Sequence, residues 1–152
     1  MGIDLELTKS TLVTLIEKLR DSQEEYRDAA ERVEAEDLKL ALMDFSTLRA
    51  WFLGKLQNEI LRLGAQDPPK AGSLGGSLHR AWMSLKTAVA SDHDLAIIEH
   101  CERDEEKLIR SYGEALDREL PRYIRELLEG QLEQIGKMRK HLTELKQRSA
   151  VV

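Results

Sequence analysis

The residues that could do chemistry are polar side chains on the apolar faces of predicted helices. Between residues 93 and 117, apolar side chains recur every three or four positions, and Glu102 and Glu105 fall on the same face. Between residues 37 and 63, Arg49 falls at the centre of the apolar face. Because a guanidinium can engage carboxylates with two parallel hydrogen bonds, this spacing predicts a buried ion pair between Arg49 and either Glu102 or Glu105.

Two glutamines occupy matching places on the other long helices. Their distances from the predicted turns put them at the same depth as the charged groups, so the sequence predicts one mid-bundle polar layer formed by Gln23, Arg49, Glu102, Glu105 and Gln131. We interpret the layer as structural, because removing one member of a buried ion pair leaves an uncompensated charge. A ligand- or proton-handling site is one alternative, and a helix phase that turns these groups toward solvent is the other.

Metal chemistry of the di-iron type would need a Glu from each of two helices and a Glu-x-x-His pair from each of the other two. The two positions for these pairs carry Ser46 with Arg49 and Gln131 with Gln134. Neither pair can ligate iron as the motif requires, and the charge of Arg49 repels a cation. We therefore expect no catalytic residue, no cofactor and no enzyme activity.

The alternative is a degenerate metal-binding bundle, for which Glu102 and Glu105 are the weak candidate ligands. The four histidines form no His-x-x-x-His pair, and we interpret them as surface or capping residues, with His100 and Asp104 as an unspecific pair four positions apart. Cys101 is the only cysteine, which excludes an intrachain disulfide and fits a reducing cytoplasm. Free cysteine usually packs as a small apolar residue.

The elements that must position these groups are five predicted helices. Four are long, each about 40 Å at 1.5 Å per residue, and one is short; we expect them at about 8–34, 37–63, 77–90, 93–117 and 121–148. The segment from about 64 to 91 contains a Gly- and Pro-rich loop and is long enough to run back along the whole bundle. The second and fourth of these helices then run parallel, so the sequence predicts an all-α four-helix bundle with a long crossover connection that carries a short extra helix.

Composition bounds the remaining possibilities. The 152 residues, of which 41% are hydrophobic and 34% charged, suit one helical domain over 1–152 with an ordered core at about 8–148. A formal net charge of −5 argues against a nucleic-acid partner. We find no signal peptide and no segment apolar enough to span a bilayer, and we expect a cytoplasmic protein without a membrane partner.

The second long helix has another apolar strip, formed by Leu40, Met43, Trp51 and Leu61. We favour the interpretation that the crossover helix with Trp82 packs over most of this strip. The alternative that stays open is a homodimer or higher homo-oligomer surface, since an exposed apolar patch marks an interface.

Several segments together resemble one family. They are Asp21-Ser22-Gln23-Glu24-Glu25-Tyr26-Arg27-Asp28-Ala29-Ala30-Glu31, Leu48-Arg49-Ala50, Gly76-Ser77-Leu78-His79-Arg80-Ala81-Trp82, Cys101-Glu102-Arg103 and Tyr112-Gly113-Glu114-Ala115-Leu116. The chain resembles the domain-of-unknown-function 2383 family of uncharacterised bacterial proteins, from about residue 8 to residue 148. The resemblance implies a ferritin-like bundle and no established activity. With the missing catalytic constellation, it favours a non-catalytic bundle that works by association or binding, in a stress-related or other role.

Overall fold

The computed structural model describes residues 4–64 and 93–150 of the chain. These residues form four helices and no strand: α1 (Leu5–Arg32), α2 (Glu36–Arg62), α4 (His93–Leu116) and α5 (Arg122–Ala150). The prediction of an all-α four-helix bundle is therefore confirmed. The predicted short helix at 77–90 and nearly all of the crossover lie outside the described residues.

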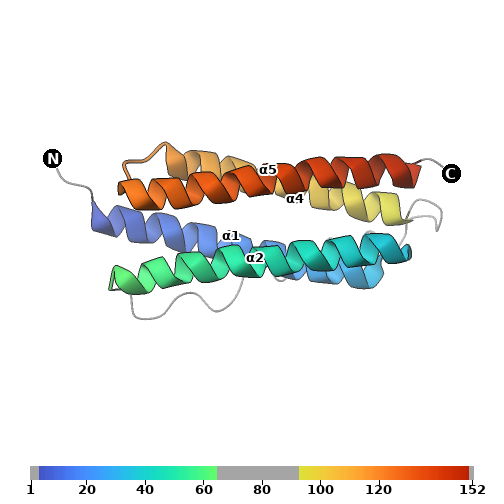
Figure 1. Cartoon of the computed structure of the whole chain (residues 1–152), viewed down its shortest axis with the longest axis horizontal. Coiled ribbons are helices and arrows are strands. Elements are labelled where there is room, and N and C mark those ends of the chain that lie inside the picture. Colours follow the sequence, from blue (N-terminus) through green and yellow to red (C-terminus); the bar gives the residue numbers. More distant parts are fainter. Residues whose placement is uncertain (1–3, 65–92, 151–152) are drawn as a thin grey trace.

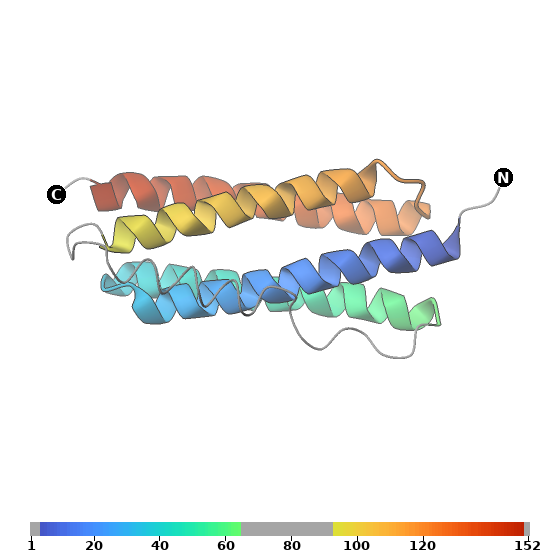
Figure 2. The same cartoon turned by 180° about the vertical axis from the view of Figure 1, so that it is seen from behind.

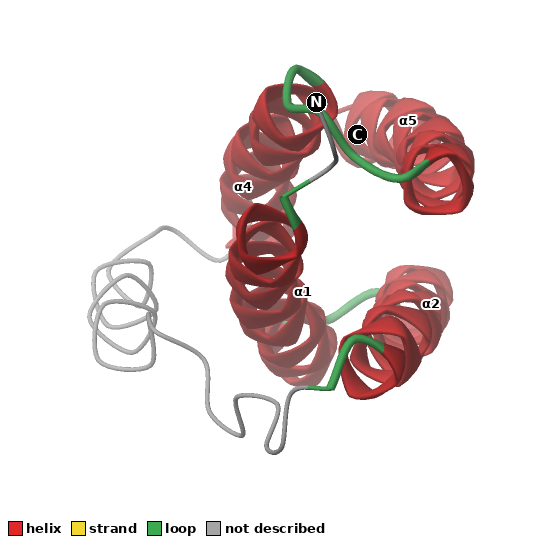
Figure 3. Ribbon diagram, turned by 90° about the vertical axis from the view of Figure 1, so that its left-hand side faces the viewer, coloured by secondary structure: helices red, strands yellow, loops and turns green. Residues whose placement is uncertain are grey.

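The four helices form two antiparallel hairpins, α1 with α2 and α4 with α5, which meet mainly where α1 packs on α4. In Figures 1 and 2, α1 and α5 run in one direction along the bundle and α2 and α4 run in the other. The predicted helices at 37–63 and 93–117, which correspond to α2 and α4, are thus parallel, as expected from the length of the segment between them. The end-on view in Figure 3 shows α1 between α2 and α4, while α2 and α5 pack least closely of the neighbouring helices.

The core follows the predicted three-and-four spacing of apolar residues on every helix. Each buried stripe faces the bundle axis, where burial of a leucine-sized side chain contributes about 1.5–3 kcal/mol. The fully buried apolar residues include Leu12, Ile16 and Leu19 of α1, Leu42, Leu56 and Ile60 of α2, Ile97 and Ile98 of α4, and Ile124, Leu128, Ile135 and Leu142 of α5. None of the described helices is both long enough and apolar enough to cross a membrane.

The helix ends show how local chemistry sets the boundaries. Asp4 caps α1, where its Oδ1 accepts hydrogen bonds from the backbone N–H groups of Glu6 and Leu7 at 3.0 and 3.2 Å. The expected start of this helix at about residue 8 is wrong by about one turn, because the Thr8 hydroxyl donates to the Asp4 carbonyl within the helix. Gly64 has φ 92°, the left-handed conformation expected directly after α2.

One contact ties the start of α4 to the turn between α1 and α2. The Asp94 carboxylate accepts hydrogen bonds from the backbone N–H groups of Glu34 and Ala35, at 2.8 and 3.0 Å. His93 Nε2 lies 3.0 Å from the Arg32 carbonyl oxygen. These bonds satisfy backbone groups that a short helix–helix turn leaves without partners, and they set the register between the two hairpins.

Candidate functional site

The interior of the bundle holds an ion pair between Arg49 of α2 and Glu105 of α4. The side chains are 0% and 1% exposed, and Arg49 Nη2 donates to Glu105 Oε1. Of the two predicted carboxylates, Glu105 is therefore the partner. The guanidinium carbon of Arg49 also lies 5.5 Å from the centroid of the Tyr26 ring, a distance at which a cation is attracted by the ring.

The surroundings keep this arginine charged. Burial alone lowers the pKa of Arg49, but the Glu105 carboxylate and Tyr26 outweigh it and raise that pKa above its ordinary value. The contact uses one guanidinium nitrogen and one carboxylate oxygen, so the predicted two-pronged pairing is not formed. Arg49 Nε and Nη1, Glu105 Oε2 and the Tyr26 hydroxyl are buried without a hydrogen bond to the described residues.

Gln131, the predicted glutamine on α5, lies one helical turn beyond the ion pair along the bundle and is 4% exposed. The Tyr112 hydroxyl donates to Gln131 Oε1 at 2.6 Å, and Gln131 Nε2 donates to the Phe52 carbonyl oxygen at 3.2 Å. Burial raises the pKa of Tyr112, so this hydroxyl keeps its proton and remains a donor. Tyr112 was not among the predicted polar residues, because a tyrosine on an apolar stripe carries no sequence signal that its hydroxyl is bonded.

The other two predicted members of the layer lie at its edge. Gln23 is half-buried and contributes its backbone carbonyl, which accepts a hydrogen bond from the Ser46 hydroxyl at 3.0 Å. Glu102 is half-buried and faces α5, where Lys146 Nζ lies 3.1 Å away and the Thr143 hydroxyl donates at 3.3 Å. Glu102 and Glu105 therefore engage different partners.

A second cluster lies on the seam between α1 and α4. His100 Nε2 lies 3.1 Å from Glu25 Oε1 and 3.5 Å from Asp104 Oδ2. Burial, and after it a hydrogen bond with Asp104, raises the pKa of Glu25 well above its ordinary value. Burial lowers the pKa of His100, while Asp104 opposes that shift. The cluster therefore combines an imidazole whose pKa is lowered with a carboxyl group, that of Glu25, whose pKa is raised, and the carboxyl group of Asp104 lies beside them.

A narrow groove of about 80 Å³ opens beside this cluster, between α1 and α4. Its lining also includes Lys18, Asp21, Ser22, Lys107 and Leu108. Sequence reasoning found the His100–Asp104 pair from its four-residue spacing but missed Glu25, because only the packing register of α1 on α4 brings that carboxyl to the pair.

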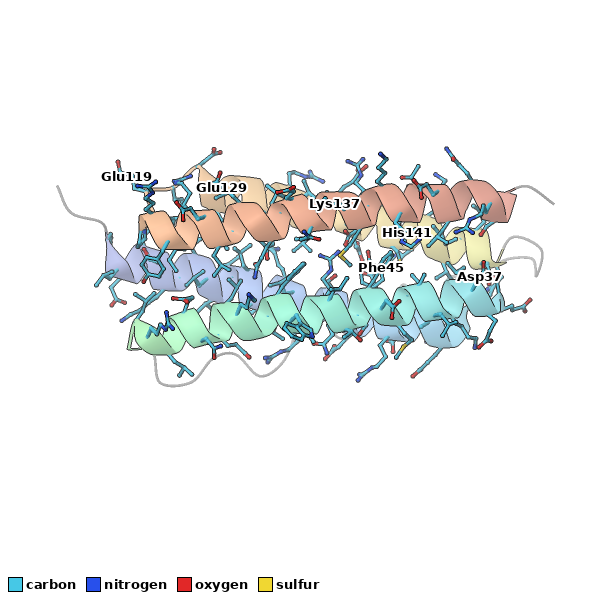
Figure 4. The ribbon with its side chains drawn as sticks, in the orientation of Figure 1. Asp37, Phe45, Glu119, Glu129, Lys137 and His141 are labelled. Atoms are coloured by element: carbon cyan, nitrogen blue, oxygen red, sulfur yellow. The ribbon has the colours of Figure 1, made fainter. Side chains whose placement is uncertain are left out.

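The surroundings of Cys101 and His141 indicate packing roles rather than chemical ones. Cys101 is 1% exposed, and burial raises the pKa of its thiol, so the thiolate needed for nucleophilic chemistry is disfavoured. His141 packs edge-on against Phe45, with ring centroids 5.4 Å apart, and Figure 4 shows the two labelled side chains between α5 and α2. His79 lies outside the described residues.

Fold and interior together define a four-helix-bundle protein with a buried ion pair between two parallel helices. The family model described as a domain of unknown function (DUF2383) matches residues 8–118. The chain belongs to this family, as its sequence segments suggested. No curated protein matches the chain.

Proposed function

We propose that the protein is a non-catalytic helical bundle that acts by association, and that its partner is a second copy of itself. The observation that carries the proposal is the apolar strip on α2, where Leu40, Trp51 and Leu61 are 63%, 66% and 53% exposed. An exposed apolar strip of this kind marks an interaction surface when its residues act together. The remaining large side chains exposed on this helix are Met43 and Leu48.

The interior supports the non-catalytic part of the proposal. Arg49 places a fixed positive charge, compensated by Glu105, at the centre of the bundle. Both members of this pair are buried and bonded to each other, so neither is free to act on a substrate as an acid or a base. The parallel course of α2 and α4 agrees with a ferritin-like origin, and the single cysteine agrees with action in a reducing cytoplasm.

The charges around the strip favour a second copy as the occupant. Leu48 and Trp51 lie at the middle of the exposed face of α2; Asp44 precedes Leu48 by four positions and Lys55 follows Trp51 by four. The exposed Asp37 and Arg62 lie further out, each eleven positions from the same pair, and Asp37 marks one end of α2 in Figure 4.

A two-fold axis through the middle of this face would pair two α2 helices antiparallel. Trp51 of each copy would then meet Leu48 of the other, and Asp44 and Asp37 would meet Lys55 and Arg62. Such self-complementarity is what an isologous dimer requires, and opposite charges across an interface fix its register.

The test is the molecular mass in solution, measured by sedimentation equilibrium over a range of concentrations. We expect a dimer for the wild-type chain and a folded monomer for Trp51→Glu, with helical content checked by circular dichroism. The matched control is Tyr123→Glu, which changes an aromatic residue on α5 that is 49% exposed. This variant should leave the dimer intact.

Charge exchange makes the test specific to the proposed pairing. Asp44→Lys alone places like charges opposite each other and should weaken the dimer, whereas Asp44→Lys combined with Lys55→Asp should restore it. A wild-type chain that is monomeric at every concentration would overturn the proposal. If Trp51→Glu then lowered the melting temperature of that monomer, the strip would be covered within the chain, as the crossover interpretation holds.

A further inference from the structure

The seam cluster is a more specific arrangement than a set of neighbouring acids. It combines one imidazole with two carboxyl groups from two different helices, and one ligand atom from each of the three residues lies within 4.8 Å of the others. We propose that Glu25, His100 and Asp104 form a binding site for a divalent first-row transition-metal ion of the Zn²⁺ type.

The spacing of the ligand atoms fits such an ion. Zinc binds imidazole nitrogen and carboxylate oxygen at about 2.0–2.2 Å, so the edge of its coordination tetrahedron is about 3.4 Å. The two distances from His100 Nε2, 3.1 Å to Glu25 and 3.5 Å to Asp104, lie on either side of that value. An ion can therefore enter with small side-chain rotations and no movement of the helices.

An independent observation is the state of one oxygen of Glu25. The Glu25 side chain is 5% exposed, and its Oε1 lies 3.1 Å from His100 Nε2 but is buried and makes no hydrogen bond to the described residues. A buried carboxyl oxygen that makes no hydrogen bond is costly, and a bound cation would satisfy it. The interior arginine does not, because Arg49 is bonded to Glu105.

The surrounding charges do not block the site. Lys107 Nζ lies 3.6 Å from Asp104 Oδ1, but the Lys107 side chain is 72% exposed and can swing into water. The His100 and Asp104 side chains are 15% and 30% exposed, which leaves a path for an ion from the groove. A lone imidazole with two carboxylates suits a borderline ion such as Zn²⁺ better than Mg²⁺, which prefers oxygen ligands throughout.

The site would join the two hairpins of the bundle. Glu25 comes from the first hairpin and His100 and Asp104 from the second. Three protein ligands leave one coordination position, on the groove side, for water. Because Glu25 must be deprotonated to ligate, binding should release a proton to solvent. This role is separate from the apolar strip on α2, so either proposal can fail without the other.

The experiment uses the full-length, tag-free and metal-stripped chain titrated with ZnCl₂. We expect one ion bound per chain by calorimetry, with proton release seen as a dependence of the heat on the buffer. The chain has only four histidines, so their imidazole signals can be followed individually in ¹H–¹⁵N spectra. The His100 signals should move when zinc binds, while those of His93 and His141 stay.

Variants then assign the ligands. Glu25→Gln and Asp104→Asn keep the side-chain shape and should each weaken zinc binding at least about tenfold, the smallest loss expected when a ligand shell is disturbed; His100→Gln should remove it. His141→Gln and Glu102→Gln are matched controls that should bind zinc as the wild type does. Absence of stoichiometric binding, binding unaffected by Glu25→Gln, or binding lost in Glu102→Gln would each overturn the proposal.

Discussion

Glu105 and Asp104 are adjacent residues of α4 that lie in opposite environments. Glu105 points into the bundle, where it is 1% exposed and paired with Arg49, whereas Asp104 faces the seam with α1, where it is 30% exposed and meets His100. One step along a helix turns a side chain by about 100°. The interior therefore holds a matched pair of charges, and the seam holds an excess of carboxyl groups. Removing one member of the interior pair would leave a buried charge without its counter-ion, and the seam is where we propose that a cation binds.

The largest expected effect comes from breaking the interior pair. Arg49→Met should lower the free energy of unfolding by about 3–5 kcal/mol, because Glu105 is then buried without its counter-ion. Urea unfolding followed by circular dichroism measures the loss.

Two further variants separate charge from packing at this position. Arg49→Met combined with Glu105→Leu should recover most of the loss, since an apolar pair of similar volume replaces a buried ion pair at little cost. Arg62→Met removes an exposed arginine from the same helix, 74% exposed and 3.5 Å from Glu59, and should change stability by less than about 0.5 kcal/mol. Equal effects of Arg49→Met and Arg62→Met would mean that Arg49 is not buried.

A smaller loss of unfolding free energy is expected at Tyr112, one turn along the interior from the ion pair. Tyr112→Phe removes the donor to Gln131 Oε1 and leaves that buried oxygen without its partner, which should cost about 1–3 kcal/mol in urea unfolding. Tyr123→Phe, at an exposed tyrosine on α5, is the control and should have no measurable effect. If the two variants have the same stability, the Tyr112 hydroxyl contributes nothing to the layer.

At the seam, substitution of a polar residue should raise the free energy of unfolding instead of lowering it. The folded protein keeps a proton on Glu25 above pH 4.5, the ordinary pKa, whereas the unfolded chain does not. The native state thus binds more protons, and this group makes the metal-free protein less stable as pH rises from 4.5 through the raised pKa.

Glu25→Gln should therefore be more stable than metal-free wild type at pH 7, and the difference should disappear below pH 4.5. The slope of that difference is bounded by one proton, about 1.4 kcal/mol per pH unit. Thermal melts of both proteins from pH 4 to pH 8 measure it. A loss of stability in Glu25→Gln at neutral pH would show that the charged form of Glu25 is stabilising.

The smallest effect is expected where α4 faces α5, at Glu102. Glu102→Gln alters a contact with the half-exposed Lys146, and the melting temperature should stay within error of the wild type. A marked drop would mean that Glu102 belongs to the interior layer, as the periodicity predicted, and would weaken the distinction between the two regions.

The helix pattern predicted the fold because apolar spacing and chain length constrain it directly. Leu42 and Ile60 on α2, or Ile98 and Tyr112 on α4, are separated by multiples of the helical repeat, and every one is buried. The length of the segment between the hairpins was sufficient to predict that α2 and α4 run parallel. The same periodicity placed Arg49 and Glu105 inside.

The periodicity could not resolve the edges of the site. Glu102 and Glu105 share the predicted face, but a residue at the margin of an apolar stripe is turned inward or outward by the packing of the next helix, and α5 draws Glu102 to Lys146. Glu25 gave no signal, because its surroundings come from α4, which is distant in sequence. The hydrogen bonds from the turn between α1 and α2 to Asp94 could not be predicted for the same reason, because the partners are distant in sequence.

The most direct test of the contrast between interior and seam is the position of a bound ion in a crystal of the zinc-soaked protein, located by anomalous scattering at the zinc edge. We expect one peak within bonding distance of Glu25, His100 and Asp104, with Arg49 still bonded to Glu105. A peak beside Glu105 with Arg49 displaced, or no peak at the seam, would contradict the contrast between interior and seam.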